Sequence, residues 1–143
     1  MASVATYLFF PGTCEAAFEF YKTVFGTDYV GNGLMRMGDM PPSPDAPEMT
    51  EERKQHVMHV GLPILAGHML MGSDDPDGTG MAGASIMLNP DTRDEADRLY
   101  AALSDGGSAD QPMGEMFWGD YWGTLTDRFG VSWQVDVAGE QHG

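Results

Sequence analysis

Cysteine, basic residues and long apolar runs are all scarce in this chain of 143 residues. The single cysteine, Cys14, can form no disulfide within the chain, so nothing points to an oxidising compartment. No apolar run approaches the roughly 18 residues that a membrane span needs. The N-terminus also lacks the basic, apolar and small-residue pattern of a signal peptide. We therefore expect a cytoplasmic protein that does not bind membranes.

Basic residues number 7 against 22 acidic ones, which gives a formal net charge of −15. Such a charge repels phosphate backbones and anionic membranes, so we expect no nucleic-acid partner. It favours solubility and modestly favours a cationic ligand. Apolar residues make up 42% of the chain, enough for a core. The length fits one domain or two small half-domains that share a core.

Two segments have the spacing and the end signals of helices. In "TCEAAFEFYKTVFG", Thr13 can cap the start and Gly26 supplies the stop. In "PDTRDEADRLYAALSDGG", Thr92 and Glu95 form a capping box, and Gly106 follows the last apolar residue. The buried stripes predicted from the helical period are Ala17, Phe18, Tyr21, Val24 and Phe25 in the first helix, and Ala96, Leu99, Tyr100 and Leu103 in the second.

Strand patterns surround both helices. A short strand precedes each helix, with Val4 to Phe10 as the first, and three strands follow each helix. After the first helix these are Tyr29 to Met37 and the two runs of "HVMHVGLPILAGHMLMGSD", which are joined at Ala66-Gly67. The sequence therefore predicts an α+β fold of one domain over 1–143, with βαβββ modules at about 1–75 and 82–138. The proline-rich segment 38–55 is either a surface loop over a site or an insertion without a role.

Three blocks, "YLFFPGTCEAAFEFYKTVFG", "HVMHVGLPILAGHMLMGSDD" and "FWGDYWGTLTDRFGVSWQV", resemble the PhnB-like branch of the vicinal oxygen chelate superfamily. This superfamily includes glyoxalases, extradiol dioxygenases and bleomycin-binding proteins. The resemblance implies two βαβββ modules that form a cupped, barrel-like mixed sheet with helices outside, a ligand cavity within and a homodimer. Such domains are also described as 3-demethylubiquinone methyltransferases. We discount that activity, because no glycine-rich turn of the kind that holds S-adenosylmethionine joins a strand to a helix.

The resemblance also implies a divalent metal, which could be zinc, nickel, manganese or iron and which acts as a Lewis acid. In the superfamily, His, Gln and Glu side chains from the first and last strand of each module hold this metal. In this sequence those positions fall on or beside Thr6, near Leu70 or Met71, near Ser85, and at Gln134, where glutamate normally stands. Only Gln134 can coordinate a metal. We therefore expect the usual four-ligand site to be missing.

Strand alternation gives an expected orientation for the remaining site residues. Gln134 lies on the polar face of the last strand, opposite Val131, Trp133, Val135 and Val137. In "HVMHVGLPI", Met58, Val60, Leu62 and Ile64 share the core face, while Val57, His59 and Gly61 take the other. His59 is then either a ligand or general base facing the cavity, or a hydrogen-bonded structural histidine. The residues expected to contact a ligand are Tyr7, Phe9, Ser85, Trp118, Asp120 and Trp122.

Two functions follow as hypotheses. The first is a protein that binds a hydrophobic or cationic small molecule between aromatic walls, as bleomycin-resistance proteins do. The second is a metal-dependent lyase, isomerase or dioxygenase that uses a rearranged set such as His59 and Gln134. The missing ligands favour the first hypothesis.

Overall fold

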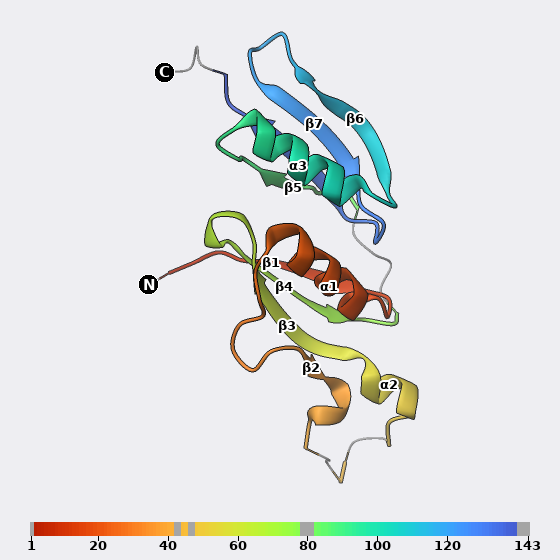
Figure 1. Ribbon diagram of the computed structural model, residues 1–143. Coiled ribbons are helices and arrows are strands. Elements are labelled where there is room, and N and C mark those ends of the chain that lie inside the picture. The colour runs from red at the N-terminus through yellow and green to blue at the C-terminus, as the bar shows by residue number, and fades with distance from the viewer. Residues whose placement is uncertain (1, 42–43, 46–47, 78–81, 140–143) are drawn as a thin grey trace. The chain divides into compact units, whose positions relative to one another are not determined.

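The computed structural model describes residues 2–41, 44–45, 48–77 and 82–139. The chain forms two compact units, Met1–Gly80 and Met81–Gly143. Each unit has a four-stranded mixed sheet with one long helix on one face (Figure 1). The predicted α+β class and the order strand, helix, three strands in each half are confirmed. None of the helices in the described residues is long and apolar enough to cross a membrane.

The first unit has the strand order β1-β4-β3-β2. β1 is parallel to β4, whereas β3 is antiparallel to both β4 and β2. Its elements are β1 (Thr6–Phe10), α1 (Cys14–Phe25), β2 (Met35–Arg36), the 3-10 turn η1 (Met37–Asp39), the short helix α2 (Glu51–Gln55), β3 (Val57–Pro63), η2 (Leu65–Gly67) and β4 (Met69–Asp74). The tight connection predicted at Ala66-Gly67 is present, with both residues at positive φ.

Helix α1 begins and ends where the sequence predicts. Gly26 closes it in the left-handed conformation and donates its N–H to the Lys22 carbonyl. Thr13 occupies the N-cap position but makes no side-chain cap. Instead, the buried carboxylate of Asp74 accepts hydrogen bonds from the backbone N–H groups of Cys14 (2.9 Å) and Val57 (2.8 Å). One side chain thus joins the start of α1, the start of β3 and the end of β4.

The predicted stripe of α1 is buried apart from Phe25, which is only half-buried. The helix approaches the sheet closely at Gly72 in β4. A Cβ added there would lie 2.5 Å from Cε1 of Phe18. Leu8, Val60 and Leu62 face the same side and are almost fully buried. The core of the first unit therefore lies between α1 and one face of its sheet.

Two predictions about the strands of the first unit are wrong. The expected strand Tyr29 to Met37 is reduced to Met35–Arg36, because positive φ angles at Gly31 and Gly33 turn the chain before it. Val57 is fully buried, although alternation from Val60 places it on the opposite face. The β2–β3 register shifts next to it, and a bulge of this kind resets which face a residue takes.

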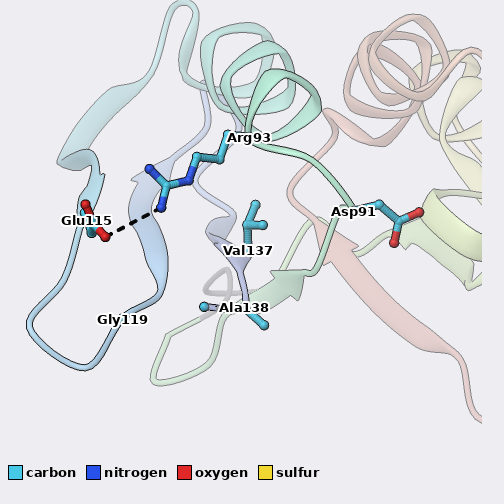
Figure 2. Close-up of a pocket in the computed structure, with 7 residues that line it drawn as sticks. Asp91, Arg93, Glu115, Gly119, Val137 and Ala138 are labelled. Carbon is cyan, nitrogen blue, oxygen red and sulfur yellow. Dashed lines mark ion pairs between the residues drawn. The ribbon is translucent and has the colours of Figure 1, made fainter. Parts of the chain in front are cut away.

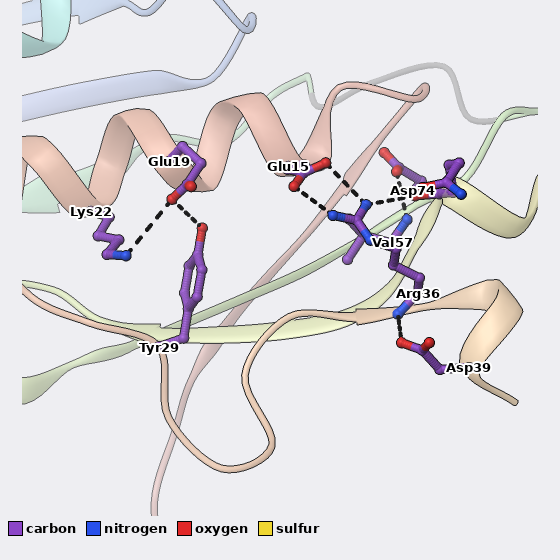
Figure 3. A network of polar contacts seen from close by, with 9 residues as sticks. Glu15, Glu19, Lys22, Tyr29, Arg36, Asp39, Val57 and Asp74 are labelled. Atoms are coloured by element: carbon purple, nitrogen blue, oxygen red, sulfur yellow. Dashed lines mark hydrogen bonds and ion pairs between the residues drawn. The ribbon is translucent and has the colours of Figure 1, made fainter. Parts of the chain in front are cut away.

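Segment 38–55 is not a plain loop, because its end forms α2, which the prediction missed. Thr50 caps this helix by accepting a hydrogen bond from the N–H of Arg53. Where the segment starts, the Arg36 guanidinium donates to both carboxylate oxygens of Glu15 in α1, at 3.0 and 2.7 Å (Figure 3). It also donates to the Gln55 carbonyl at 3.0 Å. The backbone N–H of Arg36 donates to Asp39. Arg36 thus fastens both ends of the segment to the first unit.

The second unit repeats the topology with the strand order β5-β8-β7-β6. β5 is parallel to β8, and the other neighbouring pairs are antiparallel. Its elements are β5 (Ile86–Leu88), α3 (Arg93–Ser104), β6 (Ser108–Glu115), β7 (Tyr121–Thr126) and β8 (Ser132–Val137). Thr92 caps α3 by accepting a hydrogen bond from the N–H of Glu95, which is one half of the predicted capping box. The Glu95 carboxylate accepts hydrogen bonds from Arg98. Tyr100 departs from the predicted buried stripe: it is half-buried, and its hydroxyl donates to the carbonyls of Gln111 and Thr124.

Candidate functional site

Each sheet has a helix-free face, which we define as the face opposite its long helix. In β8, Trp133 and Val135 lie under α3 and are fully buried, so Ser132, Gln134 and Asp136 take the helix-free face. This is the orientation that alternation predicts. The strand register places Met87 of β5 beside Gln134, and Met87 is 48% exposed.

A chain of hydrogen bonds runs across the helix-free face of the second sheet. The indole Nε1 of Trp122 donates to Oε1 of Gln134 at 3.0 Å. Nε2 of Gln134 in turn donates to the Ser85 hydroxyl oxygen at 2.7 Å. Three residues predicted for the site are thereby connected, although they come from β7, β8 and the segment before β5. Both ends of the Gln134 amide are engaged, which fixes its orientation.

The turn between β6 and β7 adds two more aromatic rings beside this chain. The Trp118 ring lies 5.9 Å from that of Trp122 in an edge-to-face arrangement, and Phe117 lies 4.9 Å from Trp118. Phe117 is 96% exposed and Trp118 41%. Gly119 bends this turn with a φ of 102°. Trp118, which was predicted to contact a ligand, therefore lies in the turn between two strands, and Phe117 was not predicted.

Asp120 does not join the aromatic rings. Its carboxylate accepts a hydrogen bond from the N–H of Gly139 at 3.0 Å, and its carbonyl accepts one from Met116. These bonds hold the β6–β7 turn against the chain that follows β8. The structure thus places Asp120 as a support for the turn that carries Trp118.

The helix-free face of the first sheet carries Tyr7, Phe9 and His59. The Tyr7 hydroxyl lies 3.3 Å from Nδ1 of His59, and their rings are 5.8 Å apart. The rings of Tyr7 and Phe9 are separated by 5.1 Å. Phe9 is 57% exposed and Tyr7 41%. These three predicted residues therefore form one exposed aromatic cluster, in which His59 is hydrogen-bonded.

The residues at the expected metal positions do not fit a divalent ion. Thr6 and Leu70 share the α1 side of the sheet with Leu8, so the helix-free face presents the Tyr7 phenol and the Met71 thioether instead. In the second unit, the Gln134 oxygen accepts from an indole, and its nitrogen is not a metal ligand. The described residues contain no group of three or more His, Cys, Asp or Glu side chains arranged to hold a metal.

A hollow of about 650 Å³ lies at the start of α3 in the second unit (Figure 2). It is lined by Asp91, Arg93, Glu115, Gly119 and residues 137–139. Arg93 lies 3.8 Å from Glu115 and covers the ring of Tyr121. None of the predicted site residues lines this hollow. The guanidinium of Arg93, which lines it, already forms an ion pair with Glu115.

A family of known proteins matches this chain over residues 2–136, and its description is 3-demethylubiquinone-9 3-methyltransferase. The chain belongs to this family. This match, together with the solved structure titled as a PhnB protein that is described below, confirms the PhnB-like resemblance predicted from the three sequence blocks.

Three individual proteins are similar to this chain over 96% of its length. The curated protein YjdN of Escherichia coli is 26% identical in an alignment of 144 positions, and the alignment covers 96% of this chain and 97% of YjdN. Protein PA1353 from Pseudomonas aeruginosa is 36% identical with a TM-score of 0.81, covering 96% of this chain and 98% of the other. A structure from Bacillus cereus titled "Putative 3-demethylubiquinone-9 3-methyltransferase, PhnB protein" is 25% identical with a TM-score of 0.73, covering 96% and 100%.

The fold extends to more distant proteins. A glyoxylase/bleomycin resistance protein/dioxygenase domain from Frankia has a TM-score of 0.61 at 10% identity, over 99% of this chain and 96% of that one. At this identity the likeness shows the fold alone.

The connections from β1 to α1 and from β5 to α3 are not rich in glycine. Residues 11–13 contain only Gly12, and residues 89–92 contain no glycine.

Proposed function

We propose that this protein binds a planar, hydrophobic or cationic small molecule without the four-ligand metal site that is usual in the vicinal oxygen chelate superfamily. One observation carries the proposal: the Trp122 indole donates a hydrogen bond to Gln134, which in turn donates to Ser85, and the Trp122 ring lies beside the exposed ring of Trp118. Contiguous exposed aromatic surface on a protein often marks a site that binds a ligand or another molecule. A ring fixed by hydrogen bonds also loses little entropy on binding, which favours affinity.

The aromatic clusters suit flat apolar ligands, and the charge of the protein suits cations. Trp and Tyr rings offer large contact areas, and their faces attract positive charge. A net charge of −15 raises the local concentration of cationic molecules. The cluster of Tyr7, Phe9 and His59 supplies a second surface of this kind. We therefore propose aromatic stacking, rather than coordination to a metal, as the source of affinity.

Neither a metal-dependent reaction nor methyl transfer finds support in the residues present. At the metal positions stand a phenol, a thioether, a hydroxyl and an amide that is already bonded to an indole. Neither strand-to-helix connection in the described residues is glycine-rich, so neither offers the close backbone approach that holds S-adenosylmethionine in a nucleotide-binding fold. From the family resemblance we also propose a homodimer, which light scattering of the purified protein would test.

Tryptophan fluorescence tests the binding proposal directly. Proflavine, a planar cation of three fused rings, should quench the tryptophan fluorescence of the wild-type protein more strongly than anthracene-2-sulfonate, a planar anion of three fused rings. Most of this quenching should disappear in Trp122→Phe and Trp118→Phe. It should persist in Trp133→Phe, because Trp133 is buried under α3. Equal quenching by both compounds, or loss of the response only in Trp133→Phe, would contradict the proposal.

Metal binding is tested separately. Protein purified without chelator would be analysed for bound metal, and its melting temperature would be measured with nickel, zinc, manganese and iron(II). We expect neither bound metal nor stabilisation. A stoichiometric ion, or a shift abolished by Gln134→Ala, would favour the metal-dependent alternative.

A further inference from the structure

The direction of the hydrogen bonds across the second sheet defines what the site can recognise. An indole nitrogen can only donate, so the oxygen of the Gln134 amide must face Trp122. The amide nitrogen must then face Ser85, whose oxygen accepts from it. The orientation of the amide is therefore set by chemistry.

Because the hydrogen bonds run from Trp122 through Gln134 to Ser85, hydrogen-bond donors are left at the Ser85 end of this row. The Ser85 oxygen is the acceptor from Gln134, so its own hydrogen is turned away from the amide. Nε2 of Gln134 carries a second hydrogen besides the one given to Ser85. Ser85 is exposed, and Gln134 is half-buried beside the exposed Met87. Both hydrogens thus belong to residues within reach of a bound molecule.

We propose that the ligand carries a neutral acceptor oxygen, such as a ketone or amide carbonyl, on a planar aromatic frame. The frame packs on Trp122 and Trp118, and the oxygen accepts hydrogen bonds from Ser85 and Gln134. A neutral oxygen is favoured over a carboxylate because Asp136 stands directly across from Trp122 on the neighbouring strand and the protein as a whole is strongly acidic. This inference rests on the proposed function, since it specifies the ligand of the same surface.

The test compares 9-fluorenone with fluorene, which share one planar frame and differ in a carbonyl. Equilibrium dialysis with protein in excess gives the ratio of their affinities. Ser85→Ala should lower the preference for fluorenone about 3- to 10-fold, the range expected for one neutral hydrogen bond. Ser132→Ala is the matched control, because Ser132 lies on the same face in β8, two residues from Gln134. It should leave the ratio unchanged.

Gln134→Glu reverses the polarity with almost no change in shape. A carboxylate accepts from both Trp122 and Ser85, so the Ser85 hydrogen turns inward and the outward donors are lost. The preference for fluorenone over fluorene should therefore fall at least as far as in Ser85→Ala.

The outcomes separate the two proposals. If both compounds bind and their affinity ratio is the same in wild type, Ser85→Ala and Gln134→Glu, the acceptor-oxygen inference is wrong while aromatic binding stands. If neither compound binds the wild-type protein, this aromatic surface is not a ligand site, and both proposals fail.

Discussion

Gly72→Ala tests which face of the first sheet α1 covers, and therefore which face carries Tyr7 and His59. The added Cβ would lie 2.5 and 2.9 Å from Cε1 and Cζ of Phe18, and 3.2 Å from the Leu8 carbonyl oxygen. Ordinary contacts between carbon atoms are about 3.5–4.0 Å, so the ring must move by about 1 Å. Phe18 is fully buried, so its ring can move only if the surrounding side chains move with it.

The expected loss of stability can be estimated from two opposing effects. Overpacking of a buried site costs about 1–3 kcal/mol. Replacing glycine by alanine in an allowed backbone conformation recovers about 0.4–1 kcal/mol from the unfolded chain. We therefore expect Gly72→Ala to lower the free energy of unfolding by about 1–2 kcal/mol.

Gly61→Ala is the matched control, since Gly61 lies in the neighbouring strand β3 and its Cβ would point to the opposite face. There it would meet the end of the exposed Val30 side chain at 3.2 Å, which can shift. We expect a change between no effect and about 1 kcal/mol of stabilisation.

Urea unfolding followed by far-UV circular dichroism measures both variants, because all three tryptophans lie in the second unit and need not report on the first. Adding Phe18→Leu to Gly72→Ala should cost less than the sum of the two single changes, because the smaller side chain makes room. A Gly72→Ala protein as stable as wild type, or a costlier Gly61→Ala, would refute the assignment of the faces.

Three further predictions concern the first unit. The carboxylate of Asp74 accepts two backbone hydrogen bonds, and the amide in Asp74→Asn can accept only through its one oxygen. Asp74→Asn should therefore lower the free energy of unfolding, measured in urea, by about 2–4 kcal/mol. The control Asp75→Asn, at an exposed position, should change it little. Hydrogen bonds from Arg36 hold the pKa of Glu15 below its usual value, so this pair stabilises the fold above the usual glutamate pKa and loses its effect as pH falls through the lowered one. Arg36→Ala should therefore flatten the loss of stability between about pH 5 and 3 by about 0.5 kcal/mol, a surface-pair value, and parallel pH profiles would contradict this. Burial, followed by the charges of Asp74 and Glu15, raises the pKa of the Cys14 thiol, so a disulfide reagent at pH 8 should react only in denaturant; rapid reaction of the folded protein would show that Cys14 is accessible.

Local patterns predict most of the fold because each depends on neighbouring residues. The two helices, their stops and the Ala66-Gly67 connection follow from spacing, caps and glycine conformation. The failures have tertiary causes. A register shift overrides the alternation at Val57, and contacts through Arg36 organise the segment that contains α2. No pattern within a single strand carries that information.

The candidate site shows the same division. Alternation alone predicts that Gln134 faces away from Trp133, because side chains of a strand point to opposite faces whatever their partners are. Sequence also names Trp118, Trp122 and Ser85, but without saying which of them meet. Their connection through the Gln134 amide depends on the pairing of β5, β7 and β8, which brings together residues up to 49 positions apart. The sequence by itself determined the order of helices and strands in each half and the direction of the Gln134 side chain, through local geometry. Tertiary structure decided that the glutamine binds an indole and a hydroxyl, because only strand pairing places those groups within hydrogen-bonding distance.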